Sequence, residues 1–373
     1  MTSVIDKRQI RDFDWLTAFL AIAIVSFGVW QIYNAQPTQT YWSKQIFGLV
    51  IALIAMAVVA ATDYRRLIDM APIFYVIGLI LLILVLIPGL GVKINGQRAW
   101  LQVPFIGRFQ PSEFVKIPVV LMLARYFGNR KLGALKISEL FVGIGILALP
   151  IALIMLEPDA GQALTYFPLL AVTLFLSAVK MRYVVLTIVA TLVFVPVAYL
   201  IGVQTGLIKG YQRERIEVIL DPENADPRGY GYHTFQSMIT VGKGRLTGIK
   251  GDKGVSQSEL KFLPEPHTDF IFAVTAENTG FVGCISLLLA YAILLSRLVV
   301  GAKQCPDRVG MLVIMAIVGG LAFQIFINVG MVLGFLPVIG VPLPLMSAGL
   351  SAVLSTFIAI GFVISVKMRR FVN

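Results

Sequence analysis

The chain has 373 residues, of which 58% are hydrophobic and 14% are charged. Because a soluble globular domain carries about a quarter charged residues, this composition excludes a single water-soluble core. The net charge of +11 would favour nucleic-acid binding in a soluble protein. In a membrane protein, an excess of Lys and Arg in cytoplasmic loops explains such a charge, and we expect no nucleic-acid partner.

The apolar residues come in long blocks rather than in short amphipathic stripes. Blocks of about 18 or more apolar residues are typical of membrane-spanning helices, and these blocks lack the period-two alternation of a transmembrane barrel. We therefore predict an all-α polytopic membrane protein that forms a single membrane domain over residues 1–373. About ten transmembrane helices are expected, at residues 15–33, 45–62, 72–90, 111–127, 139–156, 163–179, 183–203, 270–300, 310–335 and 347–367.

The first apolar block follows a polar, charged stretch that ends at Asp14, and it is too long for the apolar part of a signal peptide. We expect it to be a retained span. The two cysteines, Cys284 and Cys305, lie within or beside apolar blocks and indicate neither a disulfide framework nor a metal site.

Charge in the loops predicts the topology. With an even number of spans both termini lie on one side, and the segments on that side are rich in Lys and Arg. The short loops on the other side hold only Lys44, Lys93, Arg98 and Arg108. We therefore predict cytoplasmic termini and a large extracytoplasmic loop at about 204–269, between the seventh and eighth helices. Its length suggests a function, and its stretch Tyr211–Leu220 suits a helix lying at the membrane interface.

Four polar clusters lie at the predicted outer ends of the spans, where ionisable groups are costly and therefore indicate function. The first contains Arg98, Arg108 and the pair Glu113 and Lys116, which are three residues apart on one face of a helix begun by Pro111. This cluster is either an anion site for a phosphate group or a helix start with an internal ion pair.

The second cluster is the turn Glu157-Pro-Asp159 before the sixth span. Two carboxylates this close could bind a metal ion. An Asp just before a helix is, however, the ordinary N-cap signal, so we favour capping by Asp159.

The third cluster, Glu265, His267 and Asp269, leads into the eighth span, and Glu277 lies about 12 Å deeper along the helix axis. The helix N-terminus favours a charged carboxylate at Asp269, which would then be able to accept a proton. Glu277 is expected to face the bundle interior or a cavity. Capping by Thr268 and Asp269 is the simpler alternative, but it does not account for the other polar residues.

The fourth cluster is an uncharged Gly/Pro segment, Val338–Ser351, at the start of the last span. Irregular backbone at membrane depth is tolerated where it lines a cavity or is buried in protein. Gln324 and Asn328 on the ninth span could hydrogen-bond across helices, but we favour plain helix packing for both.

Taken in order and spacing, these motifs resemble the SEDS family of peptidoglycan glycosyltransferases across the whole chain. The matching segments are Asn95-Gly…Trp100-Leu101, Gln110-Pro-Ser-Glu113…Lys116, Glu157-Pro-Asp-Ala-Gly161, Tyr230-Gly-Tyr-His-Thr-Phe-Gln-Ser237, Gly242-Lys-Gly244, Leu263-Pro-Glu-Pro-His-Thr-Asp-Phe-Ile-Phe-Ala273 and Gly340-Val-Pro-Leu-Pro344. The chain departs from the family pattern at Glu157, where Gln is frequent, and at Ala348-Gly-Leu350, where Tyr-Gly-Gly is usual. Its short N-terminus and total length are closer to members that act in elongation than in division.

The resemblance implies a polymerase of lipid II in the bacterial cytoplasmic (inner) membrane, surrounded by membrane lipid and active on the outer side. It also implies a class B penicillin-binding protein, a transpeptidase, as partner. The family's essential acid corresponds to Asp269. Other family motif positions correspond to Arg98, Glu113, Lys116, Asp159, Glu265 and His267.

The expected reaction is glycosyl transfer, in which a sugar hydroxyl of one lipid-linked disaccharide attacks the anomeric carbon of another and lipid pyrophosphate leaves. Asp269 is the candidate base. The candidates for binding the substrate and its pyrophosphate are Arg98, Arg108, Glu113, Lys116, Asp159, Glu265, His267 and Glu277. A divalent cation, Mg²⁺ or Mn²⁺, could share this task, although the sequence assigns no metal ligand set.

Two other functions are compatible with the sequence. A flippase for the same lipid-linked precursor would also have many spans and buried charges, but its polar groups would follow the whole path across the membrane. A non-catalytic scaffold for a penicillin-binding protein would tolerate replacement of Asp269. The chain has no nucleotide-binding P-loop motif, so ATP-driven transport by this chain alone is unsupported.

Overall fold

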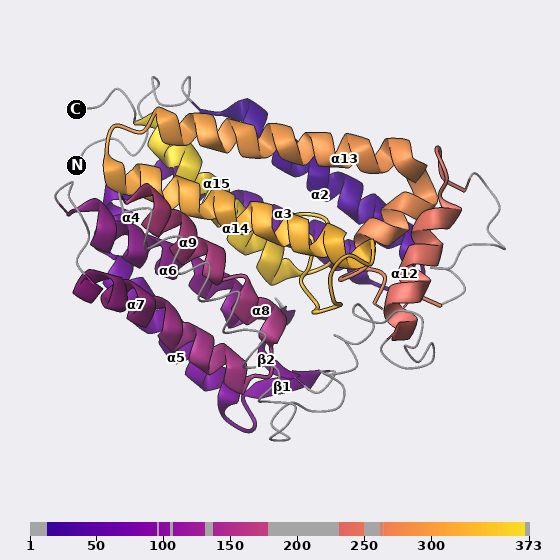
Figure 1. Cartoon of the computed structure of the whole chain (residues 1–373), viewed down its shortest axis with the longest axis horizontal. Helices are drawn as coiled ribbons and strands as arrows, with labels where there is room; N and C mark the ends of the chain where they lie inside the picture. The colour runs from indigo at the N-terminus through magenta and orange to yellow at the C-terminus, as the bar shows by residue number, and fades with distance from the viewer. Residues whose placement is uncertain are drawn as a thin grey trace.

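The computed structural model describes residues 13–94, 97–104, 107–130, 137–177, 231–249, 262–263 and 265–369. These residues form long helices and one small sheet (Figure 1). The helices are α2 (Trp15–Ala35), α3 (Tyr41–Ala61), α4 (Tyr64–Asp69), α5 (Ala71–Leu86), α6 (Pro111–Gly128), α7 (Ile137–Leu156), α8 (Ala160–Leu164), α9 (Phe167–Leu176), α12 (Gly231–Lys243), α13 (Ile271–Lys303), α14 (Arg308–Val332) and α15 (Leu350–Met368). The strands are β1 (Gly91–Ile94), β2 (Gln97–Val103) and β3 (Gly107–Phe109).

Within the described residues, 6 helices are long and apolar enough to cross a membrane: α2, α3, α7, α13, α14 and α15. Ala71–Leu86 and Ala160–Leu176 are shorter apolar helical stretches. The predicted seventh span at 183–203 and the amphipathic stretch Tyr211–Leu220 lie outside the described residues. Most of the predicted spans therefore correspond to observed helices, while their total number stays a prediction.

In the structure, one predicted span is broken into two helices and another begins later than predicted. The span expected at 163–179 is broken into α8 and α9 by a turn at Thr165 and Tyr166, and a proline lies in the first turn of α9. Proline suits the start of a helix but not its interior, so the break follows from Pro168. The last helix begins at Leu350, because the Gly/Pro segment before it forms turns instead of helix.

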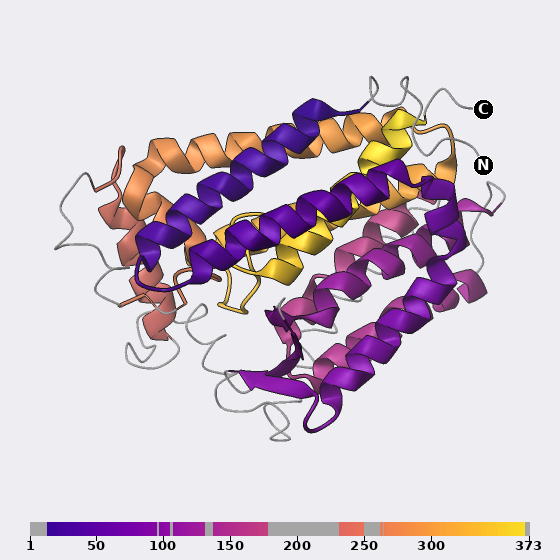
Figure 2. The same ribbon diagram turned by 180° about the vertical axis from the view of Figure 1, so that it is seen from behind.

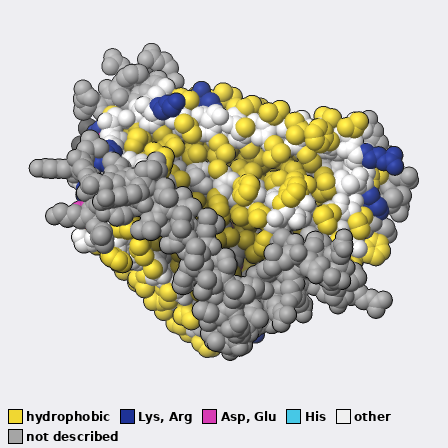
Figure 3. Space-filling model, viewed as in Figure 1, with side chains coloured by type: hydrophobic (Ala, Val, Ile, Leu, Met, Phe, Trp, Pro, Cys, Tyr) yellow, Lys and Arg dark blue, Asp and Glu magenta, His cyan; other side chains and the backbone are white. Residues whose placement is uncertain are grey.

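The outer faces of the helices carry the apolar side chains that a lipid environment requires. Phe19 is 66% exposed, Ile54 61% and Phe141 66%. Figure 3 shows apolar side chains over much of one face, with Lys and Arg side chains gathered toward its ends. An apolar surface of this extent is far larger than a soluble monomer exposes, which agrees with an integral membrane protein.

Buried apolar side chains form two clusters. One lies mainly among α2, α3, α13 and α15 and includes Tyr291 and Phe357. The other lies mainly among α4 to α9, α14 and α15 and includes Tyr64 and Phe362. Because α15 contributes to both clusters, it joins the two groups of helices, and it lies between them in both views (Figures 1 and 2).

The segment between α5 and α6 forms a three-stranded antiparallel sheet in the order β1-β2-β3. The sequence indicates only a short outer loop here, with the third span extending to residue 90. The helix ends at Leu86 because the chain then enters the turn Pro88-Gly89-Leu90, where Gly89 has a φ of +92°. A positive φ suits glycine and interrupts a helix.

Helix α13 is kinked at Gly280, whose φ of +66° and ψ of −165° are not helical. The segment after α12 packs into the kink, where Phe281 N donates to Arg245 O at 2.8 Å and Ile249 N donates to Glu277 O at 2.9 Å. A β-carbon on Gly280 would lie 2.4 Å from Gly248 N. The kink therefore requires glycine on both steric and conformational grounds.

The start of α2 and the end of α15 lie at the same end of the bundle. Asp14 accepts hydrogen bonds from Arg297 Nη2, at 2.9 Å, and from Lys367 Nζ. Asp14 and Lys367 are both buried. This ion-paired cluster holds the first and last described helices together at the end opposite the sheet (Figure 1).

Candidate active site

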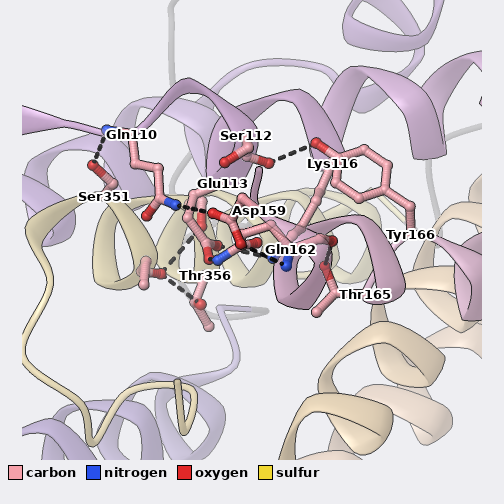
Figure 4. A network of polar contacts seen from close by, with 12 residues as sticks. Gln110, Ser112, Glu113, Lys116, Asp159, Gln162, Thr165, Tyr166, Ser351 and Thr356 are labelled. Carbon is pink, nitrogen blue, oxygen red and sulfur yellow. Dashed lines mark hydrogen bonds and ion pairs between the residues drawn. The ribbon is translucent and has the colours of Figure 1, made fainter. Parts of the chain in front are cut away.

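Three sequence-distant elements meet where α6 and α8 begin and α15 starts beside them (Figure 4). Gln162 on α8 donates through Nε2 to Glu113 Oε1 at 2.6 Å, and its backbone N donates to Asp159 Oδ1 at 3.1 Å. Gln110 Nε2 donates to Asp159 Oδ2 at 3.1 Å. Glu113 and Asp159, predicted from separate motifs, thus belong to one hydrogen-bonded network, which we call the acid cluster (Glu113, Lys116, Asp159, Gln162).

The ion pair expected within α6 is present. Lys116 Nζ lies 3.1 Å from Glu113 Oε2, and the two side chains are 14% and 5% exposed. Helical spacing of three residues puts both on one face. Lys116 therefore supplies the positive charge of the acid cluster, although much of it is balanced by Glu113.

Asp159 is the N-cap of α8, as the sequence analysis favoured, because its side chain accepts from the backbone of Gln162. Burial raises the pKa of Asp159 to about 6, against the hydrogen bond from Gln162 that lowers it. Its neighbour Glu157 is fully buried, and neither carboxylate oxygen has a hydrogen-bond partner among the described residues. Burial raises the pKa of Glu157 to about 8, with a further contribution from Asp159.

A cavity of about 60 Å³ lies beside the acid cluster, between α6, α9, α14 and α15. Its polar lining residues are Glu113, Lys116, Thr165, Gln324, Ser355 and Thr356. The other lining residues are apolar, among them Ile117, Leu169 and Ile317, and a cavity of this size has room for a few water molecules. The acid cluster thus borders a small, mostly apolar space between these helices.

Asp269 lies in a turn that runs directly into α13 and is half-buried. Helix α13 has Phe270 as its N-cap, without a side-chain cap hydrogen bond. The N-cap position therefore lies one residue beyond Asp269, and a role of Thr268 and Asp269 in capping stays a prediction. Asn328 Nδ2 on α14 donates to Asp269 O at 2.9 Å and to Val341 O at 2.8 Å, so the favoured interpretation of Asn328 as a plain packing residue was wrong.

His267 packs in the same turn. Its ring stacks on Tyr41 of α3 with the centroids 3.9 Å apart, and its Nε2 lies 3.7 Å from Glu265 Oε2. Burial lowers the pKa of His267, while Glu265 raises it. Glu265 itself has a φ of +42° and a side chain that is 48% exposed. His267 and the exposed Glu265 therefore lie in the same turn as Asp269, two and four residues before it.

The Gly/Pro segment before α15 connects Asp269 with the acid cluster. A β-carbon on Gly340 would lie 3.4 Å from Asp269 Oδ2, and one on Gly161 would lie 2.2 Å from Ile339 O. Gly161 follows Asp159 by two residues. The same short stretch of backbone therefore contacts the catalytic candidate on one side and the start of α8 on the other.

The other predicted residues are more dispersed. Arg98 on β2 donates through Nη1 to Leu86 O at 3.2 Å, and Arg108 is exposed on β3 opposite Gln102. The contacts of the described residues do not bring these arginines into the acid cluster. Glu277 is fully buried on α13 beside the Gly280 kink, as expected of an acid facing the bundle interior.

Three residues that hold the site together, Gln110, Gln162 and Ser351, are not indicated as site residues by the sequence. Gln162 and Gln110 bind the two carboxylates, and Gln110 N also donates to Ser351 Oγ at 2.8 Å. Gln110 and Ser351 belong to segments singled out in the sequence and Gln162 directly follows one, but the partners lie far apart in sequence. No periodicity signal indicates such contacts.

The described residues do not provide a fitting metal site. They contain no group of three or more His, Cys, Asp or Glu side chains that could hold a metal ion. The carboxylate oxygens of Glu113 and Asp159 are already bound by Gln110, Gln162 and Lys116. We therefore derive no catalytic step through a metal from this geometry.

The fold and the site define a class: multi-spanning helical membrane proteins with an acid at the start of one helix and a buried acid cluster nearby. The family model of the FtsW/RodA/SpoVE cell cycle proteins matches residues 11–371. The chain belongs to this family, an assignment that agrees with the resemblance to the SEDS proteins.

Individual relatives support the assignment over most of the chain. Peptidoglycan glycosyltransferase MrdB of Escherichia coli is 37% identical over 327 residues, which cover 88% of this chain and 85% of that protein. Stage V sporulation protein E of Bacillus subtilis is 34% identical over 359 residues, covering 94% and 93%.

Solved structures show the same fold. A chain from a study of how a peptidoglycan synthase complex coordinates polymerization and crosslinking superposes with a TM-score of 0.81 at 32% identity, covering 97% of this chain and 99% of that chain. Thermus thermophilus rod shape determining protein RodA superposes with a TM-score of 0.72 at 28% identity, covering 97% and 98%.

Proposed function

We infer that this chain is a peptidoglycan glycosyltransferase that polymerises lipid II into glycan strands during cell-wall elongation. It is an integral protein of the bacterial inner membrane and acts with a class B penicillin-binding protein. The observation that carries this conclusion is the similarity to MrdB over 88% of the chain, together with the TM-score of 0.81 to a chain of a peptidoglycan synthase complex.

Asp269 is the proposed base. A hydroxyl of one lipid II attacks the anomeric carbon of another, and the new bond forms between the hydroxyl oxygen and that carbon. The bond from the anomeric carbon to the pyrophosphate oxygen breaks, the hydroxyl proton passes to the Asp269 carboxylate, and the negative charge leaves on lipid pyrophosphate. A positioned base contributes about 10² to 10⁴-fold to such a step. The half-buried position of Asp269 beside irregular backbone supports this role, because a substrate can reach it.

Positive charge is proposed to stabilise the leaving pyrophosphate. Lys116 is the candidate nearest the cavity, and Arg98 and Arg108 are candidates on the sheet. Glu113 and Asp159 hold Lys116 and Gln162 in place. A requirement for Mg²⁺ or Mn²⁺ stays a prediction, and polymerisation before and after EDTA treatment, with each cation added back, tests it.

We also propose how the protein is oriented in the membrane. We expect the sheet and Asp269 to face outward and the cluster of Asp14 and Lys367 to face the cytoplasm, because Lys and Arg favour the cytoplasmic side. In a variant without Cys284 and Cys305, a cysteine at Arg108 should react with an impermeant maleimide on intact spheroplasts. A cysteine at Gln304, which is exposed near the opposite end, should react only after lysis. The reverse pattern would contradict the proposed orientation.

Polymerisation of labelled lipid II by the purified protein, alone and with its cognate penicillin-binding protein, tests the function. Glycan ladders are expected, at least with the partner. Absence of ladders under both conditions, combined with lipid II translocation in liposomes, would favour a flippase instead.

A further inference from the structure

Gln45 on α3 is a buried polar side chain that reaches the segment beside Asp269. It is 3% exposed. Its Nε2 donates to Ser347 O at 3.0 Å, and its Oε1 accepts from Gly349 N at 3.0 Å. Both ends of one amide group thus bind a single short stretch of backbone, two residues apart, which fixes both the position and the direction of that stretch.

Ser347 in turn is hydrogen-bonded to the turn that contains Asp269, the proposed base. Its Oγ donates to Thr268 O at 2.6 Å and accepts from Leu343 N at 2.8 Å. The next residue adds a second bond, because Ala348 N donates to His267 O at 2.8 Å. Thr268 directly precedes Asp269 in the chain, so the contacts lead from α3 to the base without interruption.

This segment depends on such contacts because it forms neither helix nor strand. Buried backbone N–H and C=O groups need partners, and here side chains of α3 and α14 provide several of them. Leu345 has a φ of +65°, a conformation that is unfavourable for a residue with a β-carbon. The surrounding structure must hold such backbone in place. Removing Gln45 would leave Ser347 O and Gly349 N without these bonds and allow the segment to shift.

We propose that Gln45 is a positioning residue for glycosyl transfer, which holds Asp269 in its reactive geometry through Ser347 and the backbone of His267 and Thr268. The inference rests on the proposed role of Asp269 as the base. Gln45 itself lies on a different helix and acts only through this chain of hydrogen bonds.

The test compares Gln45→Met with the matched control Gln31→Met in steady-state polymerisation of lipid II. Gln31 on α2 is also buried and makes a helix-to-helix bond, accepting from Asn278 Nδ2 at 2.9 Å, but this bond goes to α13 and not to the segment before α15. A displacement of about 1 Å costs up to about 10²-fold in rate. We expect Gln45→Met to lower kcat about 10- to 100-fold with KM little changed, and Gln31→Met to keep kcat.

Ser347→Ala provides a second, smaller change along the same path. It should lower kcat in the same way, and the double variant Gln45→Met/Ser347→Ala should lose little more than either single variant. Full kcat in Ser347→Ala or in folded Gln45→Met would overturn the proposal, as would an equal loss in Gln31→Met. Asp269→Asn run alongside separates the two claims. If Asp269→Asn is inactive and Gln45→Met is fully active, only the positioning role fails, whereas an active Asp269→Asn overturns both.

Discussion

The carboxylate of Asp269 lies directly over Gly340: a β-carbon at Gly340 would come within 3.4 Å of Asp269 Oδ2. Gly340 also has a φ of +72°, which a residue with a side chain rarely adopts. The backbone of Gly340 therefore lies beside the Asp269 carboxylate without a side chain between them. The preceding carbonyl, Ile339 O, contacts Gly161, so the same backbone also sets the start of α8 beside the acid cluster.

Gly340→Ala should impair catalysis more than it impairs folding. The positive φ costs alanine about 1–2 kcal/mol, and the added methyl group would come into van der Waals contact with the Asp269 carboxylate, on which any shift of the strained backbone would then act. Gly89→Ala is the matched control, because Gly89 also has a positive φ, +92°, but nothing lies within 4 Å of a β-carbon there. We expect similar losses in thermal stability for both variants and a fall in polymerisation only for Gly340→Ala. Equal polymerisation by the two variants would contradict a role for Gly340 at the site.

Substitutions at Glu113 and Lys116 should show whether this ion pair has a structural or a chemical role. Glu113→Gln leaves the largely buried ammonium group of Lys116 without its carboxylate, which destabilises by about 3–5 kcal/mol. The double variant Glu113→Gln/Lys116→Met has no unpaired charge and should recover most of that stability. If Lys116 contributes charge to the reaction, the double variant stays inactive in polymerisation although it folds. Recovery of activity together with stability would show that the pair is only structural.

Glu157 should make stability depend on pH. Its pKa is about 8 in the folded protein against an ordinary value of 4.5. Between these values the folded protein keeps a proton that the unfolded chain has lost, so the free energy of unfolding falls as pH rises through this window. Glu157→Gln removes that dependence. Thermal unfolding in detergent should show the variant close to wild type at about pH 5 and more stable than wild type at about pH 8.5.

Asp159 adds a dependence of the same sign, because its pKa is also raised, to about 6. The difference between wild type and Glu157→Gln isolates Glu157, since Asp159 is present in both. An equal difference in unfolding temperature at both pH values would show that Glu157 is not a buried, protonated acid.

The sequence predicted those parts of the site that follow from local geometry. Glu113 and Lys116 are one helical turn apart, and Asp159 precedes a helix, so an ion pair and an N-cap could be expected, and both are present. The helices themselves follow from long apolar blocks. The ends of these helices do not follow from the apolar blocks, because single residues such as Pro168 and Gly89 interrupt the helical backbone within or beside a block.

Contacts between distant segments could not be predicted in this way. Gln162 binds Glu113 across 49 residues, and Gln45 binds Ser347 across 302 residues. Such bonds depend on how the helices pack, which hydrophobic periodicity does not specify. The same reason explains Asn328, whose amide binds the carbonyls of Asp269 and Val341 although the sequence favoured simple packing. The total helix count, the outer loop and the roles of individual site residues stay predictions.

Replacement of Asp269 tests the central claim most directly. Asp269→Asn keeps the size of the side chain but removes the group that accepts the proton. In polymerisation of labelled lipid II with the cognate penicillin-binding protein present, wild type should produce glycan ladders and Asp269→Asn should produce almost none, at equal abundance and equal thermal stability. Ladders formed by Asp269→Asn at the wild-type rate would contradict the account, because the reaction would then not depend on this carboxylate.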